Sequence, residues 1–132
     1  MGEHYRPIMR RIEFERFVLT LQGATLVRQW RDDSVAKVGG KIFALLDDDP
    51  GELCFKASDM AFDLLCDLDG IRPAPYFARA RWVAVSEASQ LSDDEIRAYI
   101  TEAHRLIATK LTRKLRADLD LEDLIAAAPQ RP

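Results

Sequence analysis

Residues 30–45, WRDDSVAKVGGKIFAL, decide the fold of this chain. They contain two short runs of β-forming residues that meet at Gly39-Gly40, and paired glycines readily adopt the positive φ that a two-residue hairpin turn requires. A second stretch, GIRPAPYFARARWV at residues 70–83, predicts a rigid, arginine-bearing loop that runs into a strand. Both stretches indicate an antiparallel sheet.

The surrounding residues predict helices on either side of this sheet region. Apolar residues at Phe14, Phe17, Val18 and Leu21 have helical spacing, and Gly23 is placed to end that helix. Strands are expected at residues 26–31, 35–38, 41–46, 53–57 and 82–85. A second helix follows Ser58, with the face Ala61, Leu64, Leu65 and Leu68. A third begins at the capping box Ser92–Glu95, with the face Ile96, Ile100, Ala103, Ile107 and Leu111.

The order α-β-β-β-β-α-β-α predicts an α+β fold, an antiparallel sheet with helices packed on one face. The 132 residues are expected to form one domain. Residues 117–132 form a tail of different character. Its apolar residues have helical spacing, so it either docks on the core as a short helix or frays in solution.

Composition narrows the functional classes. The net charge is −3, which argues against extensive phosphate contacts over the whole surface. No apolar run approaches the roughly 20 residues of a membrane span, and residues 1–11 lack the apolar segment of a secretory signal, so a cytoplasmic protein is expected. Cys54 and Cys66 form no CxxC pair, so we expect two small buried hydrophobes and no metal or redox centre.

The chain resembles the MmcQ/YjbR family of small bacterial proteins over about residues 14–116. The resemblance rests on Trp30, the hairpin Lys37-Val38-Gly39-Gly40-Lys41, Phe43-Ala44-Leu45, Phe55-Lys56, Gly70 to Tyr76, Ala80 to Val83, and the lysines Lys110 and Lys114. The chain departs from the family pattern at Gln22, Ala36 and Thr112. A threonine in place of proline at position 112 would let the third helix continue without a break.

The resemblance implies a fold shared with frataxin-type and secretion-chaperone-type proteins, and DNA binding of a double-wing type. On that basis double-stranded DNA is the first expected partner. Arginine forks and lysines suit a phosphate backbone, and a hairpin wing could enter a groove. The candidate nucleic-acid-binding residues are Lys37, Lys41, Lys56, Arg72, Arg79 and Arg81. The same cations could instead line a solvated strand edge, where lysine blocks edge-to-edge aggregation.

A catalytic or cofactor site is not predicted. His4 and His104 stand in no recognisable motif, and the acidic residues Asp47, Asp48, Asp49 and Glu52 lack the alternating ligand spacing of a calcium loop, so a polar turn is expected there. Trp30 and Trp82 are expected to be core residues.

The hairpin also predicts a protein-interaction surface. If Lys37 pairs with Ile42, one face of the hairpin carries Val38, Lys41, Phe43 and Leu45, and the other carries Val35, Ile42, Ala44 and Leu46. Both faces are apolar, but a single helical layer covers only one. The second must be covered by the tail, by another copy in a homodimer, or by a protein partner. A protein-interaction or chaperone-like module is therefore the alternative to DNA binding.

Overall fold

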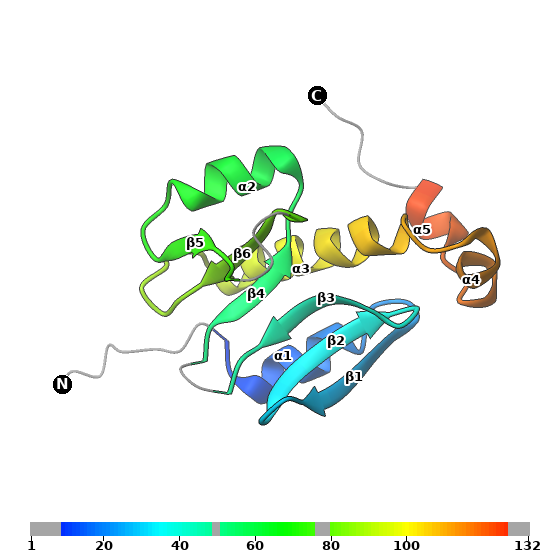
Figure 1. Cartoon of the computed structure of the whole chain (residues 1–132), viewed down its shortest axis with the longest axis horizontal. Coiled ribbons are helices and arrows are strands. Elements are labelled where there is room, and N and C mark those ends of the chain that lie inside the picture. Colours follow the sequence, from blue (N-terminus) through cyan, green and yellow to red (C-terminus); the bar gives the residue numbers. More distant parts are fainter. Residues whose placement is uncertain (1–8, 49–50, 76–79, 127–132) are drawn as a thin grey trace.

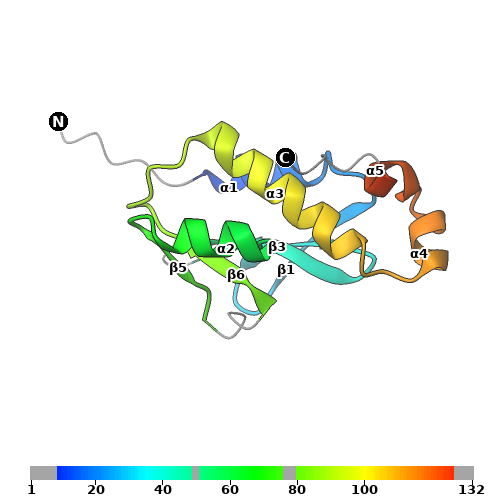
Figure 2. The same cartoon turned by 90° about the horizontal axis from the view of Figure 1, so that it is seen from above.

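The computed structural model describes residues 9–48, 51–75 and 80–126. Its centre is a six-stranded antiparallel sheet with the strand order β1-β2-β3-β4-β6-β5. The three longer helices lie on the same side of the sheet, as the view from above shows (Figure 2). The predicted α+β class, with an antiparallel sheet and helices packed on one face, is confirmed.

The elements follow one another along the chain as drawn in Figure 1. They are α1 (Arg11–Val18), β1 (Ala24–Gln29), β2 (Asp33–Val38), β3 (Lys41–Leu46), β4 (Leu53–Lys56), α2 (Asp59–Cys66), β5 (Ile71–Pro73), β6 (Trp82–Val85), α3 (Asp93–Ala108), α4 (Arg113–Asp118) and α5 (Glu122–Ala126). β5 was not predicted, since residues 71–73 were expected to be loop; they pair with β6 at the edge of the sheet.

The β2–β3 hairpin forms at the predicted turn. Gly39 has φ +59° and Gly40 has φ +81°, and Lys37 pairs with Ile42. The register then shifts between Ala36 and Lys37, which leaves an additional residue in β3. Such a bulge reverses the alternation of side chains beyond it.

The bulge makes the predicted division of the hairpin faces wrong. Leu45 lies on the side without helices, together with Val35 and Ile42, whereas Phe43, Ala44 and Leu46 join Val38 in the core under the helices. The prediction that both faces of the hairpin carry apolar side chains is confirmed. The helix-free face has its own buried cluster of Val35, Leu45, Ala74, Trp82 and Ala84.

The helix caps are as predicted for α2 and α3. Ser58 Oγ accepts a hydrogen bond from the backbone N–H of Ala61, and Ser92 and Glu95 form a reciprocal capping box. The third helix does not continue through Thr112. It ends at Ala108, and the Thr112 hydroxyl accepts from the N–H of Leu115 to begin α4. Threonine at this position therefore starts a new helix, because its side chain satisfies one of the free donors at a helix N-terminus.

Two expectations about apolar residues are wrong. Trp30 is 58% exposed and has φ +59°, because it lies in the turn between β1 and β2 and not in a strand. Leu64, on the outward side of α2, and Leu68, just beyond the end of that helix, are exposed, and within α2 Leu65 is the fully buried residue. Trp82 is in the core as predicted, with 5% exposure.

The described part of the tail packs on the helical side of the sheet. Leu121 is fully buried in the main core, and Leu119 and Ile125 lie against it. The Gln22 side-chain amide donates to the carbonyl oxygen of Leu119. The tail through Ala126 therefore does not cover the helix-free face.

Candidate functional site

The predicted cations occupy different surroundings. Lys37, Lys41, Lys56 and Arg81 lie at the end of the sheet where β2 and β4 end and β3 and β6 begin. Arg72 lies on the edge strand β5. Arg79 lies outside the described residues.

Most of these cations are already engaged within the protein. Arg72 Nη2 lies 2.6 Å from Glu52 Oε1. Arg81 donates to Asp59, and its guanidinium stands 5.3 Å from the ring centre of Phe62.

Lys56 is also engaged. It is 9% exposed and donates to the carbonyl oxygen of Ala80. Burial, followed by the charge of Lys110, lowers its pKa. Lys56, Arg81 and Lys110 are therefore close enough to interact.

Lys37 and Lys41 make no ion pair with any residue that the structure describes. Lys37 alternates with Val38 along β2 and so points to the helix-free face, whereas Lys41 is the partner of Val38 and belongs to the opposite face. The two lysines flank the turn on opposite sides. The structure does not bring them together with Arg72.

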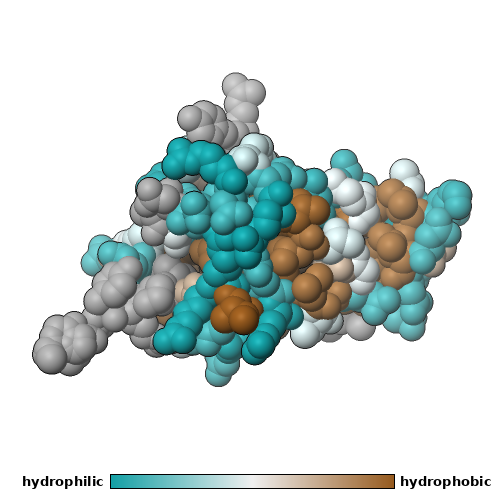
Figure 3. Space-filling view, turned by 90° about the horizontal axis from the view of Figure 1, so that it is seen from below, coloured by the Kyte–Doolittle hydropathy of each residue, from teal (hydrophilic) through white to brown (hydrophobic). Residues whose placement is uncertain are grey.

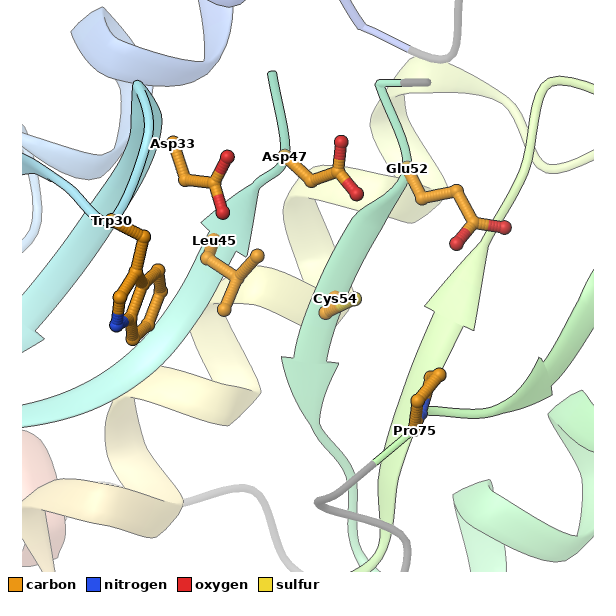
Figure 4. Close-up of a pocket in the computed structure, with 7 residues that line it drawn as sticks. All are labelled: Trp30, Asp33, Leu45, Asp47, Glu52, Cys54 and Pro75. Carbon is orange, nitrogen blue, oxygen red and sulfur yellow. The ribbon is translucent and has the colours of Figure 1, made fainter. Parts of the chain in front are cut away.

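A different set of residues converges at the other end of the sheet, on its helix-free face. There the surface has a hollow of about 380 Å³, which we call the Trp30 hollow. Figure 4 shows the three carboxylates in a row along one edge, and Leu45 and Cys54 beneath that row, between Trp30 on one side and Pro75 on the other. The hollow is lined by Trp30, Asp33, Leu45, Asp47, Glu52, Cys54 and Pro75.

The sheet accounts for the floor of the Trp30 hollow. Leu45 and Cys54 are directly opposite each other in the β3–β4 pair, so their side chains share a face. The acids come from strand ends: Asp33 begins β2, Asp47 follows β3, and Glu52 precedes β4. A smaller hollow of about 150 Å³ continues from the first and shares Trp30, Asp33 and Asp47 with it.

The rim carboxylates are held in place. Asp33 Oδ1 accepts from the N–H of Asp48 at 2.9 Å, and Asp47 Oδ1 accepts from the N–H of Gly51 at 3.1 Å. Among the described residues, Glu52 has the cationic partner Arg72, and no ion pair links Asp33 or Asp47 to a cation. The described lining of the two hollows contains Asp33, Asp47, Asp48 and Glu52 but one cationic side chain, Arg31, so its charge is negative in excess.

An ion-pair clamp fixes the turn that carries Trp30. Arg11 of α1 donates to the carboxylate and the carbonyl oxygen of Asp32, and its second nitrogen also reaches Asp48 Oδ1 at 3.0 Å. Hydrogen bonds from Arg11 and then Arg28 lower the pKa of Asp32. The clamp ties the turn next to Trp30 to the loop next to Asp47, so the two sides of the hollow are preorganised.

The comparisons with known proteins agree with this architecture. A family model described as YjbR matches residues 19–106. The chain belongs to the YjbR family. A crystal structure of a Deinococcus radiodurans protein with a DUF419 domain superimposes with a TM-score of 0.78 at 20% identity, covering 96% of this chain and 99% of that one. A Pseudomonas syringae protein superimposes with a TM-score of 0.64 at 22% identity, covering 74% and 98% of the two chains. At these identities the likeness shows the fold alone. No curated protein matches.

The thiol of Cys54 in this YjbR-family protein lies half-buried at the floor of the hollow. Burial, followed by the charges of Glu52 and Asp47, raises the pKa of Cys54 to about 12. A thiol with that pKa stays protonated at neutral pH and is a poor nucleophile. Within the described ranges no group of three potential ligands could hold a metal ion, and no helix is long and apolar enough to cross a membrane.

The remaining exposed apolar residues of this YjbR-family protein are spread over several elements. Seen from below, apolar residues gather toward the end with α4 and α5 and are separated by hydrophilic ones (Figure 3). The large exposed apolar side chains among the described residues are Ile12, Leu19, Val27, Trp30, Met60, Leu64, Leu68 and Leu115. Trp30 is the one that lines the hollow.

Sequence reasoning missed Trp30, the acidic rim and the Arg11 clamp as parts of one site. A signal was present in Trp30-Arg31-Asp32-Asp33, since adjacent aspartates favour turns and Asp33 pairs with Gln29 across a short loop. The clamp joins residues far apart in sequence and gave no local signal.

Proposed function

We propose that this YjbR-family protein is a non-enzymatic binding module that takes a basic, extended peptide segment of another protein on its helix-free sheet face. The single observation that carries the proposal is the Trp30 hollow. Its volume lies at the low end of the roughly 300–1,000 Å³ typical of ligand sites. The raised pKa of Cys54 supports a binding role over nucleophilic catalysis.

The chemistry of the hollow suits a lysine or arginine side chain. The aliphatic stem would lie on Leu45 and Cys54, because long cationic side chains bury their methylenes and keep the charged end in a polar environment. The charged end would meet the rim carboxylates and the indole of Trp30. A cation over an exposed tryptophan gains roughly 0.5–1 kcal/mol, and a carboxylate partner adds a charge-assisted hydrogen bond.

Charge also disfavours two other occupants of this face. A DNA phosphate would be repelled by Asp33 and Asp47. A second copy in a two-fold dimer would bring two acidic rims together, because such an interface presents the same patch on both sides. The free thiols of Cys54 and Cys66 support a role in a reducing compartment, and we propose the cytoplasm.

DNA binding by a double wing is the second candidate. It is favoured by Lys37 and Lys41, which flank the turn of the β2–β3 hairpin without an ion pair in the described structure. Lys110 and Arg81 lie near Lys56 at the same end of the sheet. The net charge of −3 and the ion pair of Arg72 argue against high affinity.

The test is the affinity of a short, unstructured lysine-rich peptide for the wild type and for Trp30→Ala, measured by isothermal titration calorimetry. We expect the substitution to weaken binding by about 1 kcal/mol, roughly fivefold. Asp33→Asn and Asp47→Asn should each weaken it as well, because asparagine keeps the acceptor oxygen and removes the charge. Asp123→Asn on α5 is the matched control. Equal affinity for wild type and Trp30→Ala would refute the proposal.

A further inference from the structure

The outward side of α2 and the residues directly after it carry an apolar row. Met60 and Leu64 lie on successive turns of α2, and Leu68 follows four residues later, just beyond the end of the helix at Cys66. They are 64%, 62% and 48% exposed. α2 is the outermost element at its side of the molecule (Figure 1). Isolated exposed leucines are common, but three large apolar side chains in a row indicate a contact surface.

The fold does not require this row. α2 is held to the core from its other side by Leu65, which is fully buried, and by Ala61, Phe62 and Cys66, which pack against the main cluster. Substitution of the outer row should therefore leave the fold intact. These apolar side chains are therefore accessible for contact with a partner.

A second hollow lies at the end of the row. It measures about 440 Å³ and lies between the residues that follow α2 and the start of α3. Its lining is Asp67, Leu68, Asp69, Gln90, Leu91 and Glu95. Leu68 belongs to both the row and the hollow, so the two form one surface, which we call the α2 surface.

The α2 surface has a strongly acidic border. Asp63 and Asp67 flank the row, and Asp69 and Glu95 stand at the hollow. α2 itself contains no lysine or arginine. The cation of Arg81 is directed to Asp59 at the beginning of the helix. The border therefore selects a partner with positive charges beside its apolar residues.

We propose that the α2 surface is a docking site for a basic amphipathic helix of another protein. An apolar row beside a hollow fits the i, i+3, i+4 side chains of such a helix, and the aspartates fit flanking lysines or arginines. A second copy of this chain packed through the same surface would place acid against acid, and anionic lipid would be repelled in the same way. The α2 surface lies on the helical side of the sheet and the Trp30 hollow on the other, so this proposal does not depend on the proposed function.

The probe is a synthetic helical peptide with leucines along one side and lysines beside them, followed by fluorescence anisotropy on the full chain. Leu64→Gln and Met60→Gln should each weaken binding at least about fivefold, as expected for anchor positions. Leu19→Gln, at a leucine that is 53% exposed at the end of α1, is the matched control and should have no effect. Asp63→Asn should weaken binding and reduce its dependence on salt.

Several results would overturn this proposal. One is an unchanged affinity in Leu64→Gln. Another is equal binding of a peptide in which glutamates replace the lysines, since that would reveal non-selective hydrophobic contact. A loss of binding in Trp30→Ala would place the peptide in the Trp30 hollow. A wild-type dimer that Leu64→Gln dissociates in sedimentation would assign the surface to self-association.

Discussion

The two glycines of the hairpin turn should respond differently to the same substitution. Both have positive φ, so an alanine at either position pays a backbone cost on the order of 1 kcal/mol. At Gly40 nothing lies within 4 Å of an added Cβ. At Gly39 the added Cβ would lie 2.6 Å from Cδ1 and 2.8 Å from Cδ2 of Leu111, which is almost fully buried.

The magnitude follows from this contact. Displacing a packed side chain costs roughly 1–3 kcal/mol, so Gly39→Ala should lose about 2–4 kcal/mol and Gly40→Ala about 1. The effect of alanine on the entropy of the unfolded chain is the same at neighbouring positions and cancels in the comparison.

Urea unfolding at pH 7.5, followed by circular dichroism, measures both variants. In a Leu111→Ala background, where the clash is gone, the cost of Gly39→Ala should fall to that of Gly40→Ala. Equal destabilisation of the two single variants would refute the packing of Leu111, which follows the end of α3, against this turn.

Further predictions concern the core and its titratable groups. Burial lowers the pKa of His104 below its ordinary 6.5, so as the pH falls the unfolded chain takes up the proton before the folded one does. The free energy of unfolding should therefore fall as the pH drops below 6.5, by at most about 1.4 kcal/mol per pH unit. His104→Gln should remove that slope in urea titrations between pH 7.5 and 5.5, and an unchanged slope would contradict the assignment. Leu121→Ala should cost about 2–5 kcal/mol in the same assay, whereas Leu115→Ala, at a partly exposed position, should cost much less. With its pKa near 12, Cys54 should react with a thiol reagent at pH 8 far more slowly in the folded protein than in urea; equal rates would contradict the raised pKa.

Local signals predicted much of the fold. β3 and β6 begin and end where expected, and the caps at Ser58 and Ser92 are present, because strand alternation, the glycine turn and the capping box act within a few residues. The bulge at Ala36 was not predictable from the pattern, because register depends on packing against the whole sheet. β5 is three residues long and includes Pro73, and only its pairing with β6 makes it a strand.

The candidate site was less predictable, because it depends on contacts across the sequence. The basic character of the hairpin and the arginine loop was visible, but the pairing of Arg72 with Glu52 joins segments 20 residues apart. Trp30 lies in a strand-like stretch, and its exposure follows from a turn that Arg11 holds from a different helix. Likewise α2 has apolar residues around most of its circumference, and only the position of the sheet decides which of them are buried.

The central claim is that the Trp30 hollow binds positively charged peptide. The most direct test is backbone and side-chain NMR of the labelled protein, titrated separately with an unstructured lysine-rich peptide and with duplex DNA at low salt. We predict that the peptide shifts the indole N–H of Trp30 and the amides of Leu45 and Cys54, and that DNA leaves them unchanged. Shifts confined to Lys37, Lys41 and the hairpin turn upon DNA addition, with no response of Trp30 to peptide, would contradict the account.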